Sequence, residues 1–100
     1  MKVLWTEQAF ARLAEVENDI AADSPAMAQR FIARLIQRTD LLARTPYMDR
    51  AVPELPESEL RELVQGNYRI ADRVRGKRVQ VLTVFEGHRR FPADDLPGKE

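Results

Sequence analysis

Arginine side chains carry most of the chemistry that this sequence could perform. Residues 61–90 hold eight basic residues against three acidic ones, a balance of +5, and seven of the eight are Arg. A guanidinium group is suited to bidentate contact with phosphate or carboxylate groups, so this segment could bind an anion or an acidic partner. It could equally form a solvated strand face with internal ion pairs, since residues 1–60 carry a balance of −3 and residues 91–100 one of −2.

Composition excludes several kinds of site. The chain carries 16 basic and 16 acidic side chains, so its formal charge is zero with the one histidine, His88, neutral. Because the chain has no cysteine, it forms neither a disulfide nor a thiolate metal site, and one histidine cannot make a histidine-rich metal site. We therefore expect no metal and no cofactor. The zero net charge also argues against a general nucleic-acid binder.

Length and hydropathy indicate one small soluble domain. The chain has 100 residues, of which 44% are apolar, and this is enough to build a single core. No run approaches the ~20 apolar residues that a membrane span needs. The N-terminus also reaches charge too early for a signal peptide. We expect a cytoplasmic protein with one domain over residues 1–92 and a tail over residues 93–100.

Hydrophobic periodicity predicts one strand and two helices in the first half of the chain. Residues 2–5 have the pattern of a short strand, and apolar residues recur at helical spacing over residues 7–22, with Thr6 as N-cap. Ser24 as N-cap and Pro25 at the first helical position begin a second helix, which continues to about Arg44. Since the break between the helices is short, we expect an antiparallel hairpin whose apolar stripes need a covering layer.

The period changes to that of strands from Leu60 onward. Residues 60–65, 68–74 and 78–85 are predicted strands, joined by tight turns at Gly66-Asn67 and at residues 75–77. Residues 46–57 contain three prolines and are predicted to be loop or edge backbone. The last strand is apolar on both faces, which fits a central position. The predicted fold is α+β: an N-terminal strand, an antiparallel helical hairpin and a three-stranded antiparallel meander, with the helices on one face of the sheet.

Alternation along the middle strand of the meander separates two sets of side chains. The set that suits the helix layer is Tyr68, Ile70, Asp72 and Val74. The opposite set is Arg69, Ala71, Arg73 and Arg75, which predicts a ridge of guanidinium groups on an open face of the sheet. Four large residues are assigned to the core: Trp5, Phe10, Phe31 and Leu35.

A series of short motifs follows the predicted elements. They are the helix start Pro25-x-x-Ala28-x-x-Phe31, Leu35, Leu42 followed by Pro46, Arg50 ahead of Val52 and Glu54, Arg61-Glu62-Leu63, Tyr68-Arg69-Ile70, and Val79–Val84 leading into Gly87 and basic residues. In this order and spacing the chain, over about residues 3–90, resembles the RelE/ParE superfamily of type II toxins, and ParE-like toxins most closely. Two positions depart from the family pattern: Asp49 stands where many members have Gly, and Glu86 where many have His. His88 comes two residues after that position, so the role of the family's histidine does not transfer to it.

The resemblance implies a toxin held inactive by a cognate antitoxin, in a hetero-oligomer with it. The antitoxin would lay a helix or strand along the helical hairpin and the sheet edge. The residues expected to contact it are Phe10, Leu13, Phe31 and Leu35. ParE-like members poison DNA gyrase, whereas RelE-like members cleave mRNA on the ribosome, and a shared fold does not choose between these targets. A diverged member that keeps only antitoxin binding is a third interpretation.

Metal-independent RNA cleavage would need a general base, a general acid and a cation beside the phosphate. The residues that could carry it are Arg61, Arg69 and His88, with Glu62, Glu86 and Tyr68 as further sources of base or acid. Simpler roles exist for most of them. His88 fits a surface residue, Glu62 an ion-pair partner of a nearby arginine, and Tyr68 a core residue. Arg61 could hold the loop at Glu54 or Glu57.

Gyrase inhibition needs a recognition surface and no catalysis. The residues expected to form that surface are Arg69, Arg73, Arg75, Arg89 and Arg90. The family's ribosome-dependent nucleases are usually strongly basic, as binding to ribosomal RNA demands, whereas this chain is neutral. ParE-like members tend to have the longer helical hairpin, so the resemblance, together with the neutral charge, favours a toxin directed at gyrase over an mRNA endoribonuclease.

Overall fold

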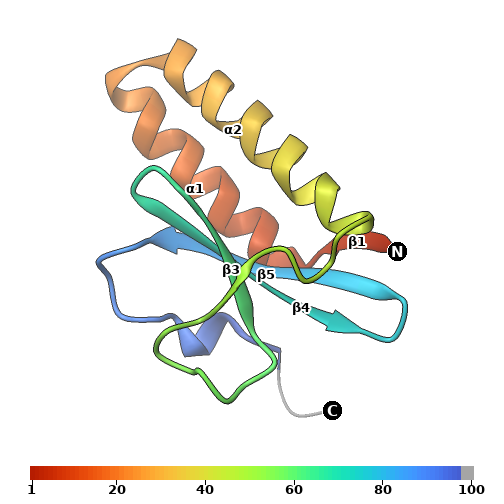
Figure 1. The fold of residues 1–100 in the computed structure, drawn as a ribbon. Coiled ribbons are helices and arrows are strands. Elements are labelled where there is room, and N and C mark those ends of the chain that lie inside the picture. Colours follow the sequence, from red (N-terminus) through yellow and green to blue (C-terminus); the bar gives the residue numbers. More distant parts are fainter. Residues whose placement is uncertain (98–100) are drawn as a thin grey trace.

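A helical hairpin packs on one face of a five-stranded sheet (Figure 1). The computed structural model describes residues 1–97. Along the chain the elements are β1 (Lys2–Trp5), α1 (Glu7–Asp23), α2 (Pro25–Asp40), the 3₁₀ turn η1 (Leu41–Ala43), β2 (Arg50–Ala51), β3 (Arg61–Gln65), β4 (Tyr68–Arg75), β5 (Arg78–Glu86) and the 3₁₀ turn η2 (Ala93–Asp95). The predicted α+β class and the predicted order of strand, hairpin and meander are confirmed.

Capping side chains fix where the helices begin. The Thr6 hydroxyl accepts a hydrogen bond from the Ala9 amide at 3.0 Å, and the Ser24 hydroxyl accepts one from the Met27 amide at 3.2 Å. Each bond satisfies an amide that has no partner within the helix. The second helix ends earlier than predicted: α2 stops at Asp40, and the chain tightens into η1 before Arg44. Leu42 is fully buried in that turn, so it keeps its place in the core although the helix has changed type.

The sheet has the order β1-β5-β4-β3-β2. Its first strand, β1, runs parallel to its neighbour β5, and the long connection between them consists of the helical hairpin and the strands β2, β3 and β4. The predicted central position of the last strand is confirmed, because β5 lies between β1 and β4. Gly66 and Gly76 have φ of +57° and +59° and stand first in their two-residue turns, where left-handed backbone favours glycine.

The shortest strand, β2, lies in the segment predicted to be loop or edge backbone, and it forms one edge of the sheet. Arg50 and Ala51 pair with Glu62 and Arg61 of β3 in antiparallel register. The pairing is two residues long and lies between prolines at positions 46 and 53, so it leaves no hydrophobic alternation to read in the sequence. Its effect is to bring the loop that carries Asp49 and Glu54 against the meander.

The main core lies between the hairpin and the sheet. Buried Val16, Leu35, Ile70 and Val81 belong to it, and Phe31 and Tyr68 pack against it with their rings edge to face, 5.2 Å apart. Tyr68 is therefore a core residue, as predicted. Phe10 is not: it is 56% exposed and stacks on Trp5 with ring centroids 5.6 Å apart. Phe10 therefore lies beside the end of β1, at an exposed margin of the core.

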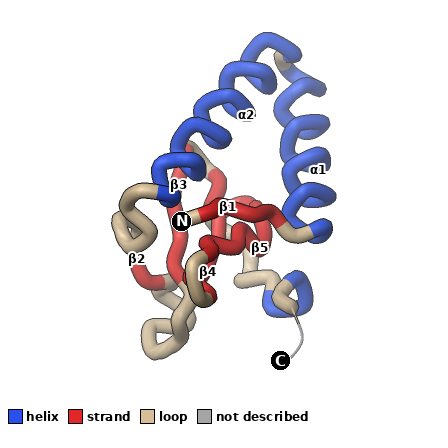
Figure 2. Tube along the Cα trace, turned by 90° about the vertical axis from the view of Figure 1, so that its right-hand side faces the viewer, coloured by secondary structure: helices blue, strands red, loops and turns tan. Residues whose placement is uncertain are grey.

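The face of the sheet opposite the hairpin is covered, and the predicted open face is wrong. A second cluster of buried side chains fills it: Val52, Leu60, Ala71, Leu82, Phe85 and Phe91. The loop between β2 and β3 and the C-terminal segment after β5 supply the cover, as the side view shows (Figure 2). Alternation identified the face correctly but carries no information about which loops return to it.

The segment predicted to be a tail is packed against the domain as far as the structure describes it. The Asp95 side chain is 4% exposed, and Phe91, just before the predicted tail, is buried against Phe85 with ring centroids 5.4 Å apart. Residues 98–100, the end of the predicted tail, lie outside the described residues. Within residues 1–97 no helix is long and apolar enough to span a membrane.

Candidate functional site

Arg69 lies at the centre of a buried charge network on the covered face of the sheet. Its side chain is 8% exposed. The Nε–H donates to Glu62 Oε1 at 2.9 Å, and the two terminal nitrogens donate to the two Glu54 carboxylate oxygens at 2.7 and 2.5 Å. The hydrogen bonds that Arg69 donates to Glu54 and Glu62 raise its pKa, although burial opposes this. The prediction that Arg69 stands on an open ridge is wrong, because the covering loop supplies Glu54 as its partner.

Glu62 holds two arginines at once. Its side chain is fully buried, with one oxygen facing Arg69 and the other accepting from Arg50 Nε at 2.8 Å. The role predicted for Glu62, an ion pair with a neighbouring arginine, is confirmed. Buried charges are tolerated only when they are paired and hydrogen-bonded. Glu62 on β3 meets that condition because Arg50 on β2 and Arg69 on β4 both bind it.

Backbone and ring contacts hold the Arg69 guanidinium in place. Its Cζ lies 4.8 Å from the centroid of the Phe85 ring, within the range of a cation–π contact. A Cβ atom built on Gly87 would lie 3.3 Å from Arg69 Cδ and 3.3 Å from the Asn67 carbonyl oxygen. Glycine therefore lets the chain after β5 pass close to the Arg69 stem, which leaves the guanidinium little room to move.

A second charge cluster surrounds Arg61 near the start of β2. Arg61 Nε donates to Asp49 Oδ1 at 3.0 Å, and its terminal nitrogen donates to the Tyr47 and Asp49 carbonyl oxygens. Arg61 does hold a loop by an ion pair, but the partner is Asp49 and not the predicted Glu54 or Glu57. Asp49 is one of the two residues that depart from the family pattern, since many members have Gly there. In this chain its carboxylate is the ion-pair partner of Arg61.

Asp72 is the member of this cluster that sequence reasoning missed. It is fully buried beside Asp49, and its two carboxylate oxygens have no hydrogen-bond partner in the described residues. Burial, with Asp49 as a neighbouring acid, raises the pKa of Asp72 to about 10. A neutral carboxylic acid is therefore the form that the fold holds at neutral pH. The sequence did contain one signal of this role. Asp72 is an acidic residue among the β4 side chains that face the helices, a set that would otherwise be apolar.

The remaining arginines of the predicted ridge are also engaged. Arg73, whose side chain is 9% exposed, donates to Gln80 Oε1 at 2.8 Å and faces Glu59 at 3.8 Å. Arg75 is half exposed and donates to the same Glu59 at 2.7 Å. Arg69 and Arg73 are thus interior residues, and only Arg75 keeps the exposure that the predicted ridge required.

The basic residues after β5 are on the surface. The His88 side chain is 74% exposed, as predicted for a surface residue, and its Nε2 lies 3.6 Å from Glu86 Oε2. Arg89 is 68% exposed and contacts Glu86 at 3.2 Å. Arg90 is exposed beside them. These residues are accessible to a large partner, unlike Arg69 and Arg73.

One hollow collects part of the set that RNA cleavage would need. It has a volume of about 390 Å³ and is lined by Arg50, Val64, Gly66, Asn67, Tyr68, Arg69, Gly87 and His88. Arg69 and His88 therefore lie around one space, but Arg61 does not line it. Both arginines in it are already paired with Glu62. The described residues contain no group of three or more His, Cys, Asp or Glu that could hold a metal ion.

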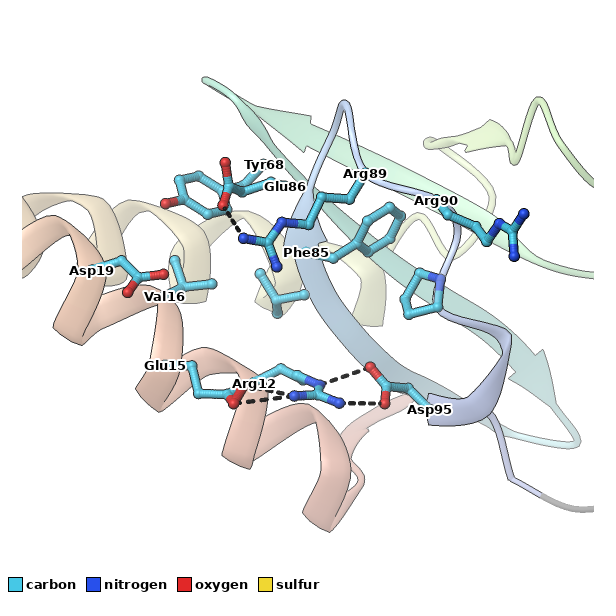
Figure 3. Close-up of a pocket in the computed structure, with 12 residues that line it drawn as sticks. Arg12, Glu15, Val16, Asp19, Tyr68, Phe85, Glu86, Arg89, Arg90 and Asp95 are labelled. Carbon is cyan, nitrogen blue, oxygen red and sulfur yellow. Dashed lines mark hydrogen bonds and ion pairs between the residues drawn. The ribbon is translucent and has the colours of Figure 1, made fainter.

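A second hollow, of about 310 Å³, lies between α1 and the C-terminal segment (Figure 3). Arg12 on α1 reaches across it and contacts both carboxylate oxygens of Asp95 at 2.8 Å. Thr83 and Gln8 also donate to Asp95, and the Arg12 hydrogen bond, the largest cause, lowers the pKa of that acid. This contact fastens η2 to the first helix, while Arg89 and Arg90 lie at the other side of the hollow.

The hairpin residues predicted to contact an antitoxin divide by exposure. Phe10 is open to a partner, and Leu13 and Phe31 are half-buried at the edge of the core. Leu35 is 1% exposed and belongs to the main core, so its predicted place on a contact surface is wrong. On α2 its position faces the sheet.

Comparisons with known proteins give one consistent result. Residues 3–91 match the family model described as the ParE toxin of the type II toxin-antitoxin system parDE. The candidate toxin Y4kP of Sinorhizobium fredii is 36% identical over 93 residues, which cover 91% of this chain and 93% of that protein. The fold is similar to that of a chain from the chromosomal ParDE system of P. aeruginosa, with a TM-score of 0.70, 21% identity, and coverage of 86% of this chain and 95% of that one.

Proposed function

The chain belongs to the ParE family of toxins of type II toxin–antitoxin systems, and from this membership we propose that it inhibits DNA gyrase and is neutralised by a cognate antitoxin. Both partners would be met in the cytoplasm. The activity needs a recognition surface and no bond cleavage. On this chain the surface would be formed by Arg75, Arg89 and Arg90, the exposed members of the predicted set.

The observation that carries this proposal is that Arg69 and Arg61 are both bound by carboxylates of the chain itself. An RNA-cleaving site needs a cation that is free to meet the phosphate. Arg69 is held by Glu54 and Glu62, and Arg61 by Asp49. Each would have to exchange a short carboxylate contact for the substrate. A target-binding toxin makes no such demand on either residue.

Cleavage of mRNA on the ribosome is the second candidate. It is favoured by one observation, the hollow that Arg69, Tyr68 and His88 share. Their types match a cation and two possible proton-transfer groups. Their protein partners and the zero net charge oppose it.

Controlled expression without antitoxin separates the candidates. A gyrase inhibitor should arrest growth with DNA damage and filamentation, and the purified protein should block negative supercoiling of a relaxed plasmid by gyrase. A nuclease should instead stop translation, with mRNA cut on ribosomes and gyrase unaffected. Unimpaired growth with a folded protein would support a diverged member that only binds antitoxin.

Phe10 and Met27 give a matched pair of exposed apolar residues for locating the antitoxin surface, since each is 56% exposed. We expect Phe10→Ala to weaken antitoxin binding roughly tenfold, because exposed aromatic residues often dominate protein interfaces. Met27→Ala, at the far end of the hairpin, should leave it unchanged. Affinity measured by calorimetry tests this, and an equal effect of both substitutions would contradict the assignment of Phe10.

A further inference from the structure

The Glu54 carboxylate covers the side of the Arg69 guanidinium to which a carboxylate from another molecule could bind. The two carboxylate oxygens of Glu54 meet the two terminal nitrogens of Arg69 side by side, at 2.7 and 2.5 Å. This is the bidentate geometry by which guanidinium groups recognise carboxylates. Glu54 approaches from a loop, and its side chain is 41% exposed, whereas the Arg69 side chain is 8% exposed.

The two carboxylates on Arg69 have different status in the fold. Glu62 is fully buried on β3, and its second oxygen is taken by Arg50, so it cannot leave without stranding a charge. Glu54 is half exposed and belongs to the turn-rich segment between β2 and β3. Within residues 1–97 its side chain contacts no cation besides Arg69 at ion-pair distance. Its departure would cost one partly solvated ion pair.

We propose that the outer edge of Arg69 is a binding site for a carboxylate of the protein that the toxin targets, and that Glu54 is an internal occupant which this partner's carboxylate displaces. The guanidinium is positioned in advance by Glu62, by the Phe85 ring at 4.8 Å and by close passage of Gly87. The hollow beside it is lined by Arg50 and Asn67, which could donate further hydrogen bonds to the arriving group.

The surrounding charge favours a carboxylate over a phosphate. Glu62 stays in place beneath the guanidinium, and Glu86 faces His88 at the rim. Exchange of Glu54 for a partner's Asp or Glu leaves the number of charges around Arg69 unchanged. A phosphate would bring a second negative charge close to the buried Glu62 carboxylate.

This inference rests on the proposed protein-directed function for its biological meaning, but the site itself can be measured without it. Glu54→Gln keeps the shape of the side chain and removes its charge. Glu57→Gln is the matched control, since Glu57 is an exposed acid of the same loop that forms no ion pair within the described residues. Thermal unfolding first establishes that both variants are folded.

The first measurement is ¹H–¹⁵N NMR of the Arg69 side chain during titration with sodium acetate, with sodium chloride for ionic strength and sodium phosphate in parallel. We expect saturable acetate binding in Glu54→Gln at roughly threefold to tenfold lower concentration than in the wild type or Glu57→Gln, because the internal competitor is gone. Equal titrations in all three proteins, or tighter binding of phosphate than of acetate, would overturn the proposal.

The second measurement is growth arrest at graded expression. If the partner's carboxylate uses this site, Glu54→Gln should arrest growth at a severalfold lower protein level than the wild type, and Glu57→Gln at the same level. Weaker arrest by a folded Glu54→Gln protein would show that Glu54 supports the surface and does not block it, which contradicts the proposal. If the wild type causes no growth arrest, the proposed function is refuted. The acetate titration would still show whether Arg69 binds a carboxylate in place of Glu54.

Discussion

At the residue scale, the main feature of this fold is a set of ionisable side chains buried in its interior. Arg69, Glu62 and Asp72 are all buried, and each would be costly if left alone. The fold treats them in two ways. Arg69 and Glu62 pair with each other, whereas Asp72 has no arginine in direct contact within residues 1–97, and its raised pKa favours the neutral acid.

The substitution Arg69→Ala should destabilise the protein by about 3 kcal/mol, because Glu62 would keep only one of its two cations while still buried. Arg75→Ala is the control. Its ion pair with Glu59 is half exposed, so the loss should stay below about 1 kcal/mol. Urea unfolding measures both. Equal, small effects would mean that Arg69 behaves as the open-face residue that alternation predicted.

The substitution Asp72→Asn should change how stability depends on pH. The pKa of Asp72 is about 10 in the folded protein, above its ordinary value, so the acid releases its proton on unfolding at neutral pH. The stability that it contributes is therefore full below pH ~4 and falls as pH rises toward the folded value. We expect the wild type to lose stability between pH 6 and 9, and the Asn variant to lose less. Urea unfolding across this range would contradict the assignment if the two profiles were parallel.

At the scale of elements, the C-terminal segment is a structural part of the domain. Phe91 fills the second core, and η2 is fastened to α1 and β5 through Asp95. The contacts come from Gln8, Arg12 and Thr83, which lie 12 to 87 positions away in the sequence. The periodicity of the segment itself gives no sign of them.

The substitution Asp95→Ala should cost about 2 kcal/mol at pH 7, since it removes a charge-assisted hydrogen-bond network around a buried acid. Asp94→Ala is the matched control, because Asp94 is the exposed neighbour. The pKa of Asp95 is lowered in the fold, so its contribution is present above its ordinary pKa and lost as pH falls. The difference between the two variants should therefore shrink in acid, as thermal unfolding at pH 7 and pH 3 can show.

At the scale of the whole molecule, the neutral chain keeps its two layers together with apolar cores on both faces of the sheet and exposes a group of basic residues after the end of β5. Arg89 and His88 follow β5 there, beside the loop of Glu54 that packs over the same sheet face. A large partner could contact this end without disturbing either core.

The substitution His88→Ala separates the two candidate functions. A toxin that binds gyrase should keep its potency, because the His88 side chain is 74% exposed and contacts only Glu86 among the acidic residues described. A nuclease that uses His88 for proton transfer should lose about 10²–10⁴ in rate. Growth arrest and primer extension on cellular mRNA read out the two cases, and abolished arrest in a folded variant would reject the gyrase proposal.

Local signals in the sequence define the two helices, the first strand and the three meander strands in the order that the structure shows, but not the short strand β2. Caps at Thr6 and Ser24, glycines at the two turns and a doubly apolar last strand are local signals, because each depends on neighbours within a few residues. The motif series then identified the family. These features also predicted correctly that Tyr68 packs in the core and that Glu62 pairs with an arginine.

The tertiary structure alone decided which arginines are available. Arg69 and Arg73 lie on the face that alternation assigned to them, but the β2–β3 loop and the C-terminal segment return to cover it and bring Glu54 and Asp95 with them. The packing of these two segments over the sheet depends on contacts between residues far apart in the chain. Such contacts produce no periodic pattern in the sequence. The same physics placed Asp49 and Asp72 together in the interior and made one of them a neutral acid.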